Sequence, residues 1–379
     1  MVIVVGAGPA GLAAAAELGR ARIPAVVLEQ ADVVGASWRD RYDRLRLNSA
    51  RWVSTLPGSR FPRGTGVFPA RDEVVGYLGD YAERHTLDVR LGVRVERIDR
   101  AGDTWRLETS AGEFEAAHVI VAGGYAHRPY VPAWPGRADF AGTLVHAAEY
   151  RSAARFREDD VLVVGPGCSG VEIAHDLAES GVRRVRLAVR TPPNMLLRDP
   201  LGVQLARALM HLPERRADAI VRFARRRTIG DLAEFGLPIP EEGVFTRLRR
   251  DHVTPTIVDR EAIEAIRARR IEVVSGVSAL DANGVQLADG TRIEPDAVIA
   301  ATGYGTGLEP VVGHLDVLDE RGVPRVLAGE VAPGLRFLGY IHRPGPLGRF
   351  GEEAREAARA IARAHRQPAT PRHPAVAAT

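Results

Sequence analysis

The sequence predicts an α/β protein with two Rossmann-like domains, the second inserted in the first. Two glycine fingerprints support this prediction: Gly6-Ala7-Gly8-Pro9-Ala10-Gly11 and Gly165-Pro166-Gly167-Cys168-Ser169-Gly170. Each follows an apolar strand pattern, at residues 2–5 or 161–164, and each precedes a helical pattern. In such a loop the first glycine permits a tight turn, the second admits a pyrophosphate, and the third lets helix pack on strand. Two matches in the correct context indicate two bound dinucleotides.

The residue after the second strand of each half distinguishes the two sites. Glu29 follows the apolar run 25–28, near the spacing of about 20 residues expected for an acid that bonds ribose hydroxyls. A carboxylate repels a 2′-phosphate, so the first site suits FAD or NAD. Arg190 follows the run 185–189, and a guanidinium accommodates a 2′-phosphate, so the second site is predicted to prefer NADPH. The alternative for Arg190 is a solvated surface arginine.

The composition excludes several other classes of protein. With 379 residues, 45% hydrophobic and 26% charged, the chain is long enough for two or three globular domains. All 51 basic residues are arginine, which rules out a lysine Schiff base and a Walker-type phosphate lysine. The net charge is only +3 and the arginines are scattered among acids, so we expect no nucleic-acid partner.

The single cysteine, Cys168, excludes an internal disulfide and a CxxC redox pair. It lies inside the second fingerprint, where a structural role is favoured over a reactive thiol. The apolar start of the chain contains Pro9 and ends in Glu17, unlike a signal sequence, and no other stretch is long enough to span a bilayer. We therefore expect a cytoplasmic protein with no membrane partner, and a homo-oligomer is possible.

The two halves share an order of elements beyond the fingerprints. The expected strands are residues 87–91, 93–98, 105–109 and 117–124 in the first half and 271–274, 284–287 and 296–304 in the second. Each half is thus predicted to contain a parallel sheet, an antiparallel insert and a closing strand. The closing strands end in Gly123-Gly124 and Gly303, where the absence of a Cβ lets the chain pass close to a nucleotide.

These patterns divide the chain into three ranges. We expect residues 1–150 to form the first part of the FAD-binding domain, 151–305 the NADPH-binding domain, and 306–379 the return of the chain to the FAD-binding domain. An arginine-rich, mostly helical insertion at about 200–238 is either a solvated pair of surface helices or a lid over the substrate entrance. In the return, residues 334–340 are expected to form a strand and turn, and 352–366 an amphipathic helix.

Residues 140–150, Phe-Ala-Gly-Thr-Leu-Val-His-Ala-Ala-Glu-Tyr, resemble the FxGxxxHxxx(Y/F/W) identifying sequence of class B flavoprotein monooxygenases. That family includes flavin-containing monooxygenases, Baeyer–Villiger enzymes and YUCCA-type indole-pyruvate monooxygenases. The motif ends in Tyr150-Arg151 rather than Trp-Pro, which resembles the first and third groups more than the second. The resemblance implies that His146 is a structural or NADP-orienting residue in the linker between domains.

Other segments extend this resemblance over nearly the whole chain. Residues 34–38, with Gly35 and Trp38, resemble the family's GGxW segment beside FAD, and residues 42–47 resemble the YUCCA-type YDRLKL. Residues 259–266 resemble the YUCCA-type approach to the next strand. Residues 296–304 match the closing DxxxxATGY, which contains Thr302 and Gly303, whereas the first-half counterpart has Gly123 where threonine is usual.

Asn48 departs from the YUCCA-type pattern, in which histidine is found at this position. The segment around it resembles the part of flavin-containing monooxygenases that carries an active-site asparagine. The resemblance therefore implies that Asn48 is catalytic and forms hydrogen bonds beside the flavin N5 and the nicotinamide amide. The alternative is a turn asparagine.

The function that this resemblance implies is an FAD- and NADPH-dependent monooxygenase. NADPH reduces the flavin, molecular oxygen converts it to a C4a-hydroperoxide, and retained NADP⁺ shields that adduct. The substrate is a soft nitrogen or sulfur nucleophile, as Asn48 suggests, or an aromatic 2-oxo acid, as the YUCCA-like stretches suggest, and Baeyer–Villiger chemistry is not excluded.

Two other functions are weighed against this one. A flavin-containing NAD(P)H oxidoreductase that inserts no oxygen is disfavoured by the 140–150 motif and, in its dithiol form, by the missing cysteine pair. A non-catalytic flavin-binding module would not explain both fingerprints. No metal site is predicted. The predicted cofactor-binding residues are Gly6, Gly8, Ala10, Gly11, Glu29, Gly35, Trp38, Gly123, Gly165, Gly167, Ser169, Gly170, Arg190, His146, Thr302 and Gly303.

Overall fold

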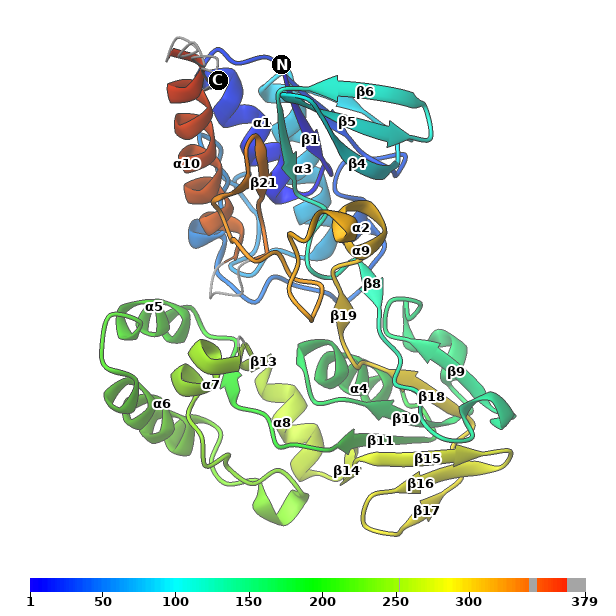
Figure 1. The fold of residues 1–379 in the computed structure, drawn as a ribbon. Coiled ribbons are helices and arrows are strands. Elements are labelled where there is room, and N and C mark those ends of the chain that lie inside the picture. The colour runs from blue at the N-terminus through cyan, green and yellow to red at the C-terminus, as the bar shows by residue number, and fades with distance from the viewer. Residues whose placement is uncertain (252, 341–345, 367–379) are drawn as a thin grey trace, which may run out of the picture.

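Two parallel sheets, each in its own lobe, form the frame of the molecule (Figure 1). The computed structural model describes residues 1–251, 253–340 and 346–366. It has the predicted fold class, an α/β protein with two Rossmann-like halves.

The first lobe is built on a six-stranded sheet with the order β20-β21-β7-β1-β2-β3, parallel except for β20. Its strands are β1 (Val2–Val5), β2 (Ala25–Leu28), β3 (Asp88–Arg90), β7 (His118–Val121), β20 (Glu330–Ala332) and β21 (Leu335–Phe337). Side chains alternate between its faces, as strand geometry requires. Val2 and Val4 pack toward α1 (Pro9–Arg20), α3 (Arg71–Arg84) and α10 (Pro346–Arg366), whereas Ile3 packs on the opposite face.

The second lobe repeats this arrangement with five parallel strands in the order β14-β11-β10-β18-β9. They are β9 (Thr143–His146), β10 (Asp160–Val164), β11 (Arg184–Val189), β14 (Glu272–Ser275) and β18 (Ala297–Ala300). Val161 and Val163 of β10 face the core under α4 (Cys168–Glu179) and α8 (Arg260–Arg267), and Leu162 faces the other side. β10 therefore occupies the place in this sheet that β1 occupies in the first, which confirms the predicted internal repeat.

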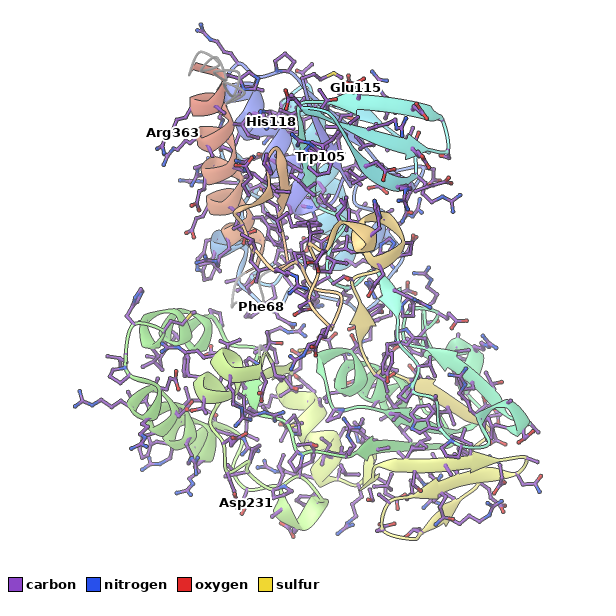
Figure 2. All side chains as sticks on the ribbon, in the orientation of Figure 1. Phe68, Trp105, Glu115, His118, Asp231 and Arg363 are labelled. Carbon is purple, nitrogen blue, oxygen red and sulfur yellow. The ribbon has the colours of Figure 1, made fainter. Side chains whose placement is uncertain are left out.

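An antiparallel three-stranded sheet covers the second face of each parallel sheet. The strands are β4 (Val95–Ala101), β5 (Thr104–Thr109) and β6 (Gly112–Ala116) in the first lobe and β15 (Val277–Asp281), β16 (Gly284–Leu287) and β17 (Arg292–Ile293) in the second. Trp105 of β5, labelled in Figure 2, is buried. Its Nε1 donates to the carbonyl of Pro333 at 3.0 Å. Strands β6, β15 and β17 were not predicted from the sequence, because two glutamates interrupt the apolar pattern of β6 and β17 has only two residues.

The chain crosses between the lobes twice, at β8 (Arg128–Pro129) and at β19 (Tyr304–Gly305), which pair with each other antiparallel. β9 follows the first crossing and pairs with β18 of the second sheet. The domain boundaries expected at 150 and 305 remain proposals, and the pairing of β9 favours an earlier first boundary, before Thr143. Within the expected range 306–379, residues 341–345 and 367–379 lie outside the described part.

Three helices of the insertion form a group at the side of the second lobe (Figure 1). They are α5 (Pro200–Leu209), α6 (Glu214–Thr228) and α7 (Val244–Asp251), so the helical stretch runs beyond residue 238. A short ribbon of β12 (Met195–Leu197) and β13 (Thr256–Val258) joins their base. The buried carboxylate of Asp218 links α6 to α7, because it accepts hydrogen bonds from the backbone of Phe245 at 2.7 Å and from the backbone and hydroxyl of Thr246.

Replacing Asp218 with alanine should loosen this helical group. The variant leaves the first amides of α7 without acceptors, at a cost of about 1–3 kcal/mol. We expect limited proteolysis to cut the 200–251 segment faster in Asp218→Ala while flavin content stays normal. Glu241→Ala, which changes an exposed side chain of the same segment, is the matched control. Equal cleavage rates for the two variants would contradict this role of Asp218.

Candidate active site

The first glycine loop has the geometry that its sequence predicts. Gly6 has a φ of +103°, and a Cβ there would stand 2.8 Å from the Ala122 carbonyl oxygen. A Cβ on Gly11 would overlap the Gly6 carbonyl oxygen, so the helix lies directly on the turn. At Gly8, by contrast, no atom lies within 4 Å of the place a Cβ would take. A side chain therefore has no room at the first and third glycines of the loop, whereas the space beside the second glycine is free.

The second loop has the same geometry. Gly165 has a φ of +112° with the Ala301 carbonyl oxygen 2.6 Å from its Cβ position, and a Cβ on Gly170 would overlap the Gly165 carbonyl oxygen. Gly167 is as open as Gly8. Helices α1 and α4 both begin at these open glycines without a side-chain cap, which leaves their first amides available. Free amides beside an open glycine fit the pyrophosphate of a dinucleotide in each lobe.

Glu29 ties the first loop to β2. Its Oε2 accepts from the Ala7 amide at 2.6 Å and its Oε1 from Ala31 at 2.9 Å, and each oxygen keeps a lone pair for a ribose hydroxyl. Gly35 donates to the Ala7 carbonyl at 3.1 Å, with Trp38 in the short helix α2 (Ala36–Arg39) that follows. Two further predicted residues lie near this loop: Ala10 is buried in α1, and Gly123 lies beside Tyr340.

Arg190 is exposed at the end of β11, on the second lobe. Two other arginines of this strand form ion pairs, Arg184 with Glu272 and Arg186 with Asp160. Within the described part of the chain, no carboxylate pairs with Arg190. An unpaired guanidinium at the end of the second strand is what binding of a 2′-phosphate requires. Ser169 is half-buried in the first turn of α4, beside the loop.

His146 bonds the loop that follows β18, residues 301–303. The Ala148 amide donates to His146 Nδ1 at 3.0 Å, so the ring proton is on Nε2, which donates to the Gly303 carbonyl at 3.0 Å. Burial lowers the pKa of His146, which favours this neutral form. Thr302 next to Gly303 donates from its hydroxyl to the carbonyl of Tyr130. Because both ring nitrogens bond the backbone, we propose that His146 acts on the nucleotide only through the position of Gly303.

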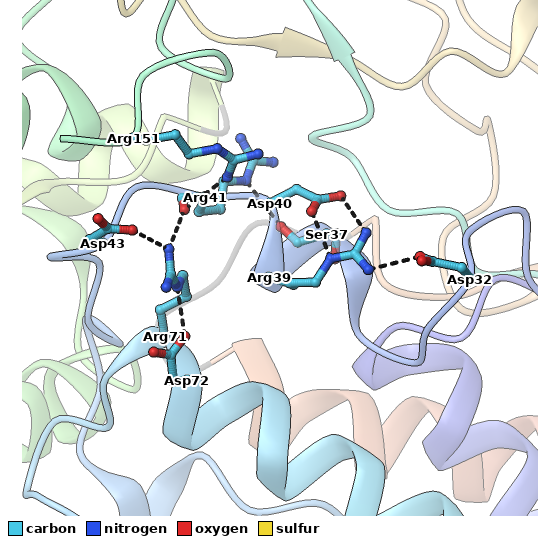
Figure 3. A network of polar contacts seen from close by, with 9 residues as sticks. All are labelled: Asp32, Ser37, Arg39, Asp40, Arg41, Asp43, Arg71, Asp72 and Arg151. Carbon is cyan, nitrogen blue, oxygen red and sulfur yellow. Dashed lines mark hydrogen bonds and ion pairs between the residues drawn. The ribbon is translucent and has the colours of Figure 1, made fainter. Parts of the chain in front are cut away.

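A network of polar contacts joins Arg151, next to the second lobe, to Arg41 and Arg71 of the first lobe (Figure 3). The Arg41 carbonyl accepts from Arg71 at 2.9 Å and from Arg151 at 3.0 Å. Arg71 also pairs with Asp43 at 2.6 Å. The guanidinium of Arg41 bonds the Tyr304 hydroxyl and lies 4.5 Å from the centre of its ring. Arg151, directly after the 140–150 motif, and Tyr304 of β19 therefore both contact residues 41–43.

Asn48 lies where the first lobe meets the second glycine loop. Its Oδ1 is 3.4 Å from Arg198 Nη2, and its side chain lies beside the Cys168 thiol. The Cys168 sulfur also accepts from the Ile257 amide at 3.3 Å, and burial raises the pKa of the thiol. These contacts support the structural interpretation of Cys168.

Within the described residues, no cluster of His, Cys, Asp and Glu could hold a metal ion.

Arg41 and Arg198 were not predicted from the sequence as site residues. Arg41 precedes the YDRLKL-like stretch, and Arg198 follows an apolar run in the second half. Ligands of α/β proteins bind at the carboxyl ends of strands, so an arginine directly after such a run is a usable signal. Neither position matches a short motif.

A large cleft of about 1850 Å³ opens between the first lobe and the insertion. Segment 51–60 and the start of α10 form one wall, Met210, Phe245 and Leu248 of the insertion form another, and segment 319–327 borders it. It carries more basic than acidic side chains: Arg60, His211, Arg249, Arg321, Arg325, Arg349 and Arg355 against Asp251, Asp319 and Glu352.

Among the described helices, none combines the length and apolar character needed to cross a membrane.

Comparison with known proteins identifies relatives of this arrangement. Residues 3–199 match the family described as pyridine nucleotide-disulphide oxidoreductase. The chain is 36% identical over 310 residues to the indole-3-pyruvate monooxygenase YUCCA1 of Oryza sativa subsp. japonica, and the match covers 80% of this chain and 76% of that protein.

Two solved structures share the fold. A double mutant of a flavin monooxygenase from Stenotrophomonas maltophilia superposes with a TM-score of 0.74 at 26% identity, over 96% of this chain and 98% of that one. A structure of OTEMO in complex with FAD and NADP has a TM-score of 0.73 over 96% of this chain and 84% of that one. Its identity of 17% makes it a likeness of fold alone.

The third glycine of each loop gives a paired test of the two sites. Gly11→Val should abolish FAD binding, because the side chain would push α1 off the Gly6 turn. Gly170→Val should keep FAD and lose reduction of the flavin by NADPH. Flavin absorbance per chain and anaerobic reduction by NADPH measure the two effects. Gly19→Ala is the control, since nothing lies within 4 Å of its Cβ position. Full flavin occupancy in Gly11→Val would refute the first assignment.

Arg190→Ala should change the preference between pyridine nucleotides. Loss of a charge-assisted contact to the 2′-phosphate is expected to cost about 1.5–3 kcal/mol, or about 10- to 150-fold in KM for NADPH, with little change for NADH. Steady-state kinetics with both nucleotides measure this. Arg184→Ala, at the other end of β11, is the control. If both nucleotides weaken equally, Arg190 is only a surface arginine.

Proposed function

This chain belongs to the class B flavoprotein monooxygenases, and we propose that its substrate is an aromatic 2-oxo acid. It is an FAD- and NADPH-dependent monooxygenase that uses molecular oxygen to oxygenate a small organic substrate. The alternative of a reductase that inserts no oxygen is therefore set aside.

When bound, FAD would supply acceptance of a hydride from NADPH and activation of molecular oxygen, which is chemistry that the side chains of this protein lack. The residues of the chain bind and orient the two nucleotides, and they exclude water. The amides at the starts of α1 and α4 hold the pyrophosphates, Glu29 bonds the ribose of the first nucleotide, and Arg190 binds the 2′-phosphate of the second. Asn48, at the contact between the first lobe and the second glycine loop, would offer its hydrogen-bond donors to the bound nucleotides.

The charge of the cleft is the observation that favours an anionic substrate. Arg60 and Arg321 form no ion pair within hydrogen-bond distance among the described residues, and the exposed ring of Trp52 offers aromatic surface in the same cleft, with Phe245 buried in its wall. Such a cleft suits an aryl group joined to a carboxylate. The relative at 36% identity is an indole-3-pyruvate monooxygenase. The balanced reaction is R–CO–COO⁻ + O₂ + NADPH + H⁺ → R–COO⁻ + CO₂ + NADP⁺ + H₂O, in which the C–C bond beside the carboxylate breaks.

Asn48 favours a second candidate substrate. The resemblance that led us to Asn48 is to flavin-containing monooxygenases, so a soft nitrogen or sulfur nucleophile remains a competing substrate class. An uncharged amine or thioether would make no use of the arginines in the cleft, so the 2-oxo acid is preferred.

We propose two further properties of this enzyme. The insertion acts as a lid, because Met210, Phe245 and Leu248 form one wall of the cleft. The enzyme acts in the cytoplasm, where NADPH is supplied, and its assembly into a homo-oligomer is open to measurement by sedimentation.

The substrate class can be tested with labelled oxygen. Holoenzyme, NADPH and indole-3-pyruvate are incubated under ¹⁸O₂, and the products are analysed by mass spectrometry. We expect one labelled oxygen in an acid shortened by one carbon, with one CO₂ per NADPH. A thioether such as methyl phenyl sulfide is tested in parallel. Labelled sulfoxide together with unchanged oxo acid would favour the second candidate.

Asn48→Ala tests the proposed catalytic amide. Without it, a polar group of the flavin or the nicotinamide loses its partner, at a cost of about 1–3 kcal/mol. We expect flavin reduction by NADPH to stay nearly normal, hydrogen peroxide released per NADPH to rise, and product to fall. Asn283→Ala, at an exposed turn, is the control. Normal coupling of NADPH to product in Asn48→Ala would leave Asn48 with a structural role.

A further inference from the structure

Arg198 is a buried arginine at the contact between the two lobes. It follows β12, and its side chain is only 3% exposed. Its guanidinium forms an ion pair with Glu172 of α4 and another, at 3.5 Å, with Asp259 at the N-terminus of α8. Two carboxylates of the second lobe therefore anchor it.

The same guanidinium reaches across the contact to Asn48 of the first lobe. Nη2 of Arg198 lies 3.4 Å from Asn48 Oδ1. A guanidinium can only donate hydrogen bonds, so the oxygen of the amide, and not its NH₂ group, must face Arg198. The two N–H donors of Asn48 then point away from Arg198. The Cys168 thiol of the second glycine loop lies within their reach.

Glu172 keeps Arg198 in this position. One of its carboxylate oxygens pairs with Arg198 and the other accepts a hydrogen bond from the Tyr42 hydroxyl. The Glu172 side chain is only 9% exposed, so these contacts are shielded from water. Because Tyr42 and Asn48 belong to the same segment of the first lobe, the Glu172–Arg198 pair bonds that segment at two points.

We propose that Arg198 is a positioning residue that orients the Asn48 amide for its part in the oxygen chemistry. The inference rests on the proposed role of Asn48. It makes the amide dependent on both lobes: Asn48 is carried by the lobe that binds FAD and is oriented by the lobe that binds NADPH. When the lobes separate, Asn48 loses the bond that decides which way its donors point.

Two simpler roles for Arg198 have to be distinguished from this one. Arg198 could hold the lobes together without acting on Asn48, or it could bind the nucleotide directly. Arg44 supplies a control for the first role, because it also crosses the contact, pairing with Asp176 and Glu179 of α4, and it forms no hydrogen bond with Asn48. A double mutant with Asn48 distinguishes the second.

The experiment compares Arg198→Met, Asn48→Ala, the double variant and Arg44→Met as holoenzymes. Hydrogen peroxide release during NADPH oxidation without substrate is measured, and the Kd for NADP⁺ is measured from the change in flavin absorbance. We expect Arg198→Met and Asn48→Ala each to raise peroxide release about five- to tenfold, the loss expected for one hydrogen bond. The double variant should release no more peroxide than Asn48→Ala, and Arg44→Met should release as much as the unmodified enzyme. Arg198→Lys retains a donor and should bring peroxide release most of the way back to that of the unmodified enzyme.

Several results would overturn the inference. Unchanged peroxide release in Arg198→Met, equal effects in Arg44→Met, or additive effects in the double variant would each do so. A weaker Kd for NADP⁺ when Arg198→Met is added to Asn48→Ala would show direct nucleotide binding instead. If Asn48→Ala itself has no effect, both the role of Asn48 and this inference fail; if only Arg198→Met has none, the inference alone fails. Should Arg198→Met not retain flavin, Arg198→Gln replaces it in the same comparison.

Discussion

The rest of the structure depends on the contact between helix and turn at the third glycine of each loop. Gly11 lies against the Gly6 carbonyl and Gly170 against the Gly165 carbonyl, with no room for a Cβ. This contact aims the N-terminus of each helix at the open second glycine, and it sets how closely α1 and α4 cover their sheets. Protein interiors do not deform smoothly, so a helix displaced here would displace the nucleotide site and the core together.

The contact between the lobes is of a different kind. It consists largely of charged and polar groups: Arg41 with Tyr304, Tyr42 with Glu172, and Arg44 with Asp176. Each lobe has its own apolar core, and from the first lobe only Tyr42 and Leu45 pack on the core of the second among the described residues. A polar contact of this sort can open at far lower cost than an apolar core can, because water replaces the lost hydrogen bonds. Each lobe would therefore stay folded if the separation between the two changed.

Most of the frame could be predicted from the sequence because it depends on local patterns. The glycine loops, the residues after the second strands and the buried parallel strands all lie within short stretches with strong periodicity. Strand β6 was missed because Glu113 and Glu115 interrupt its apolar residues and because it forms only by pairing with β5. The Arg198 cluster joins residues 48, 172, 198 and 259, and no pattern within one segment could reveal contacts between four segments.

The paired strands β8 and β19 determine what motion the two lobes can make. Both chain crossings run through this one narrow ribbon, and its backbone hydrogen bonds keep the crossings in register. A two-stranded ribbon bends readily out of its own plane, whereas sliding one strand along the other would break those bonds. The lobes should thus rotate relative to each other as two rigid bodies, about a single hinge axis that runs through this ribbon. His146 and Tyr304 lie next to that axis, where a rotation moves atoms least.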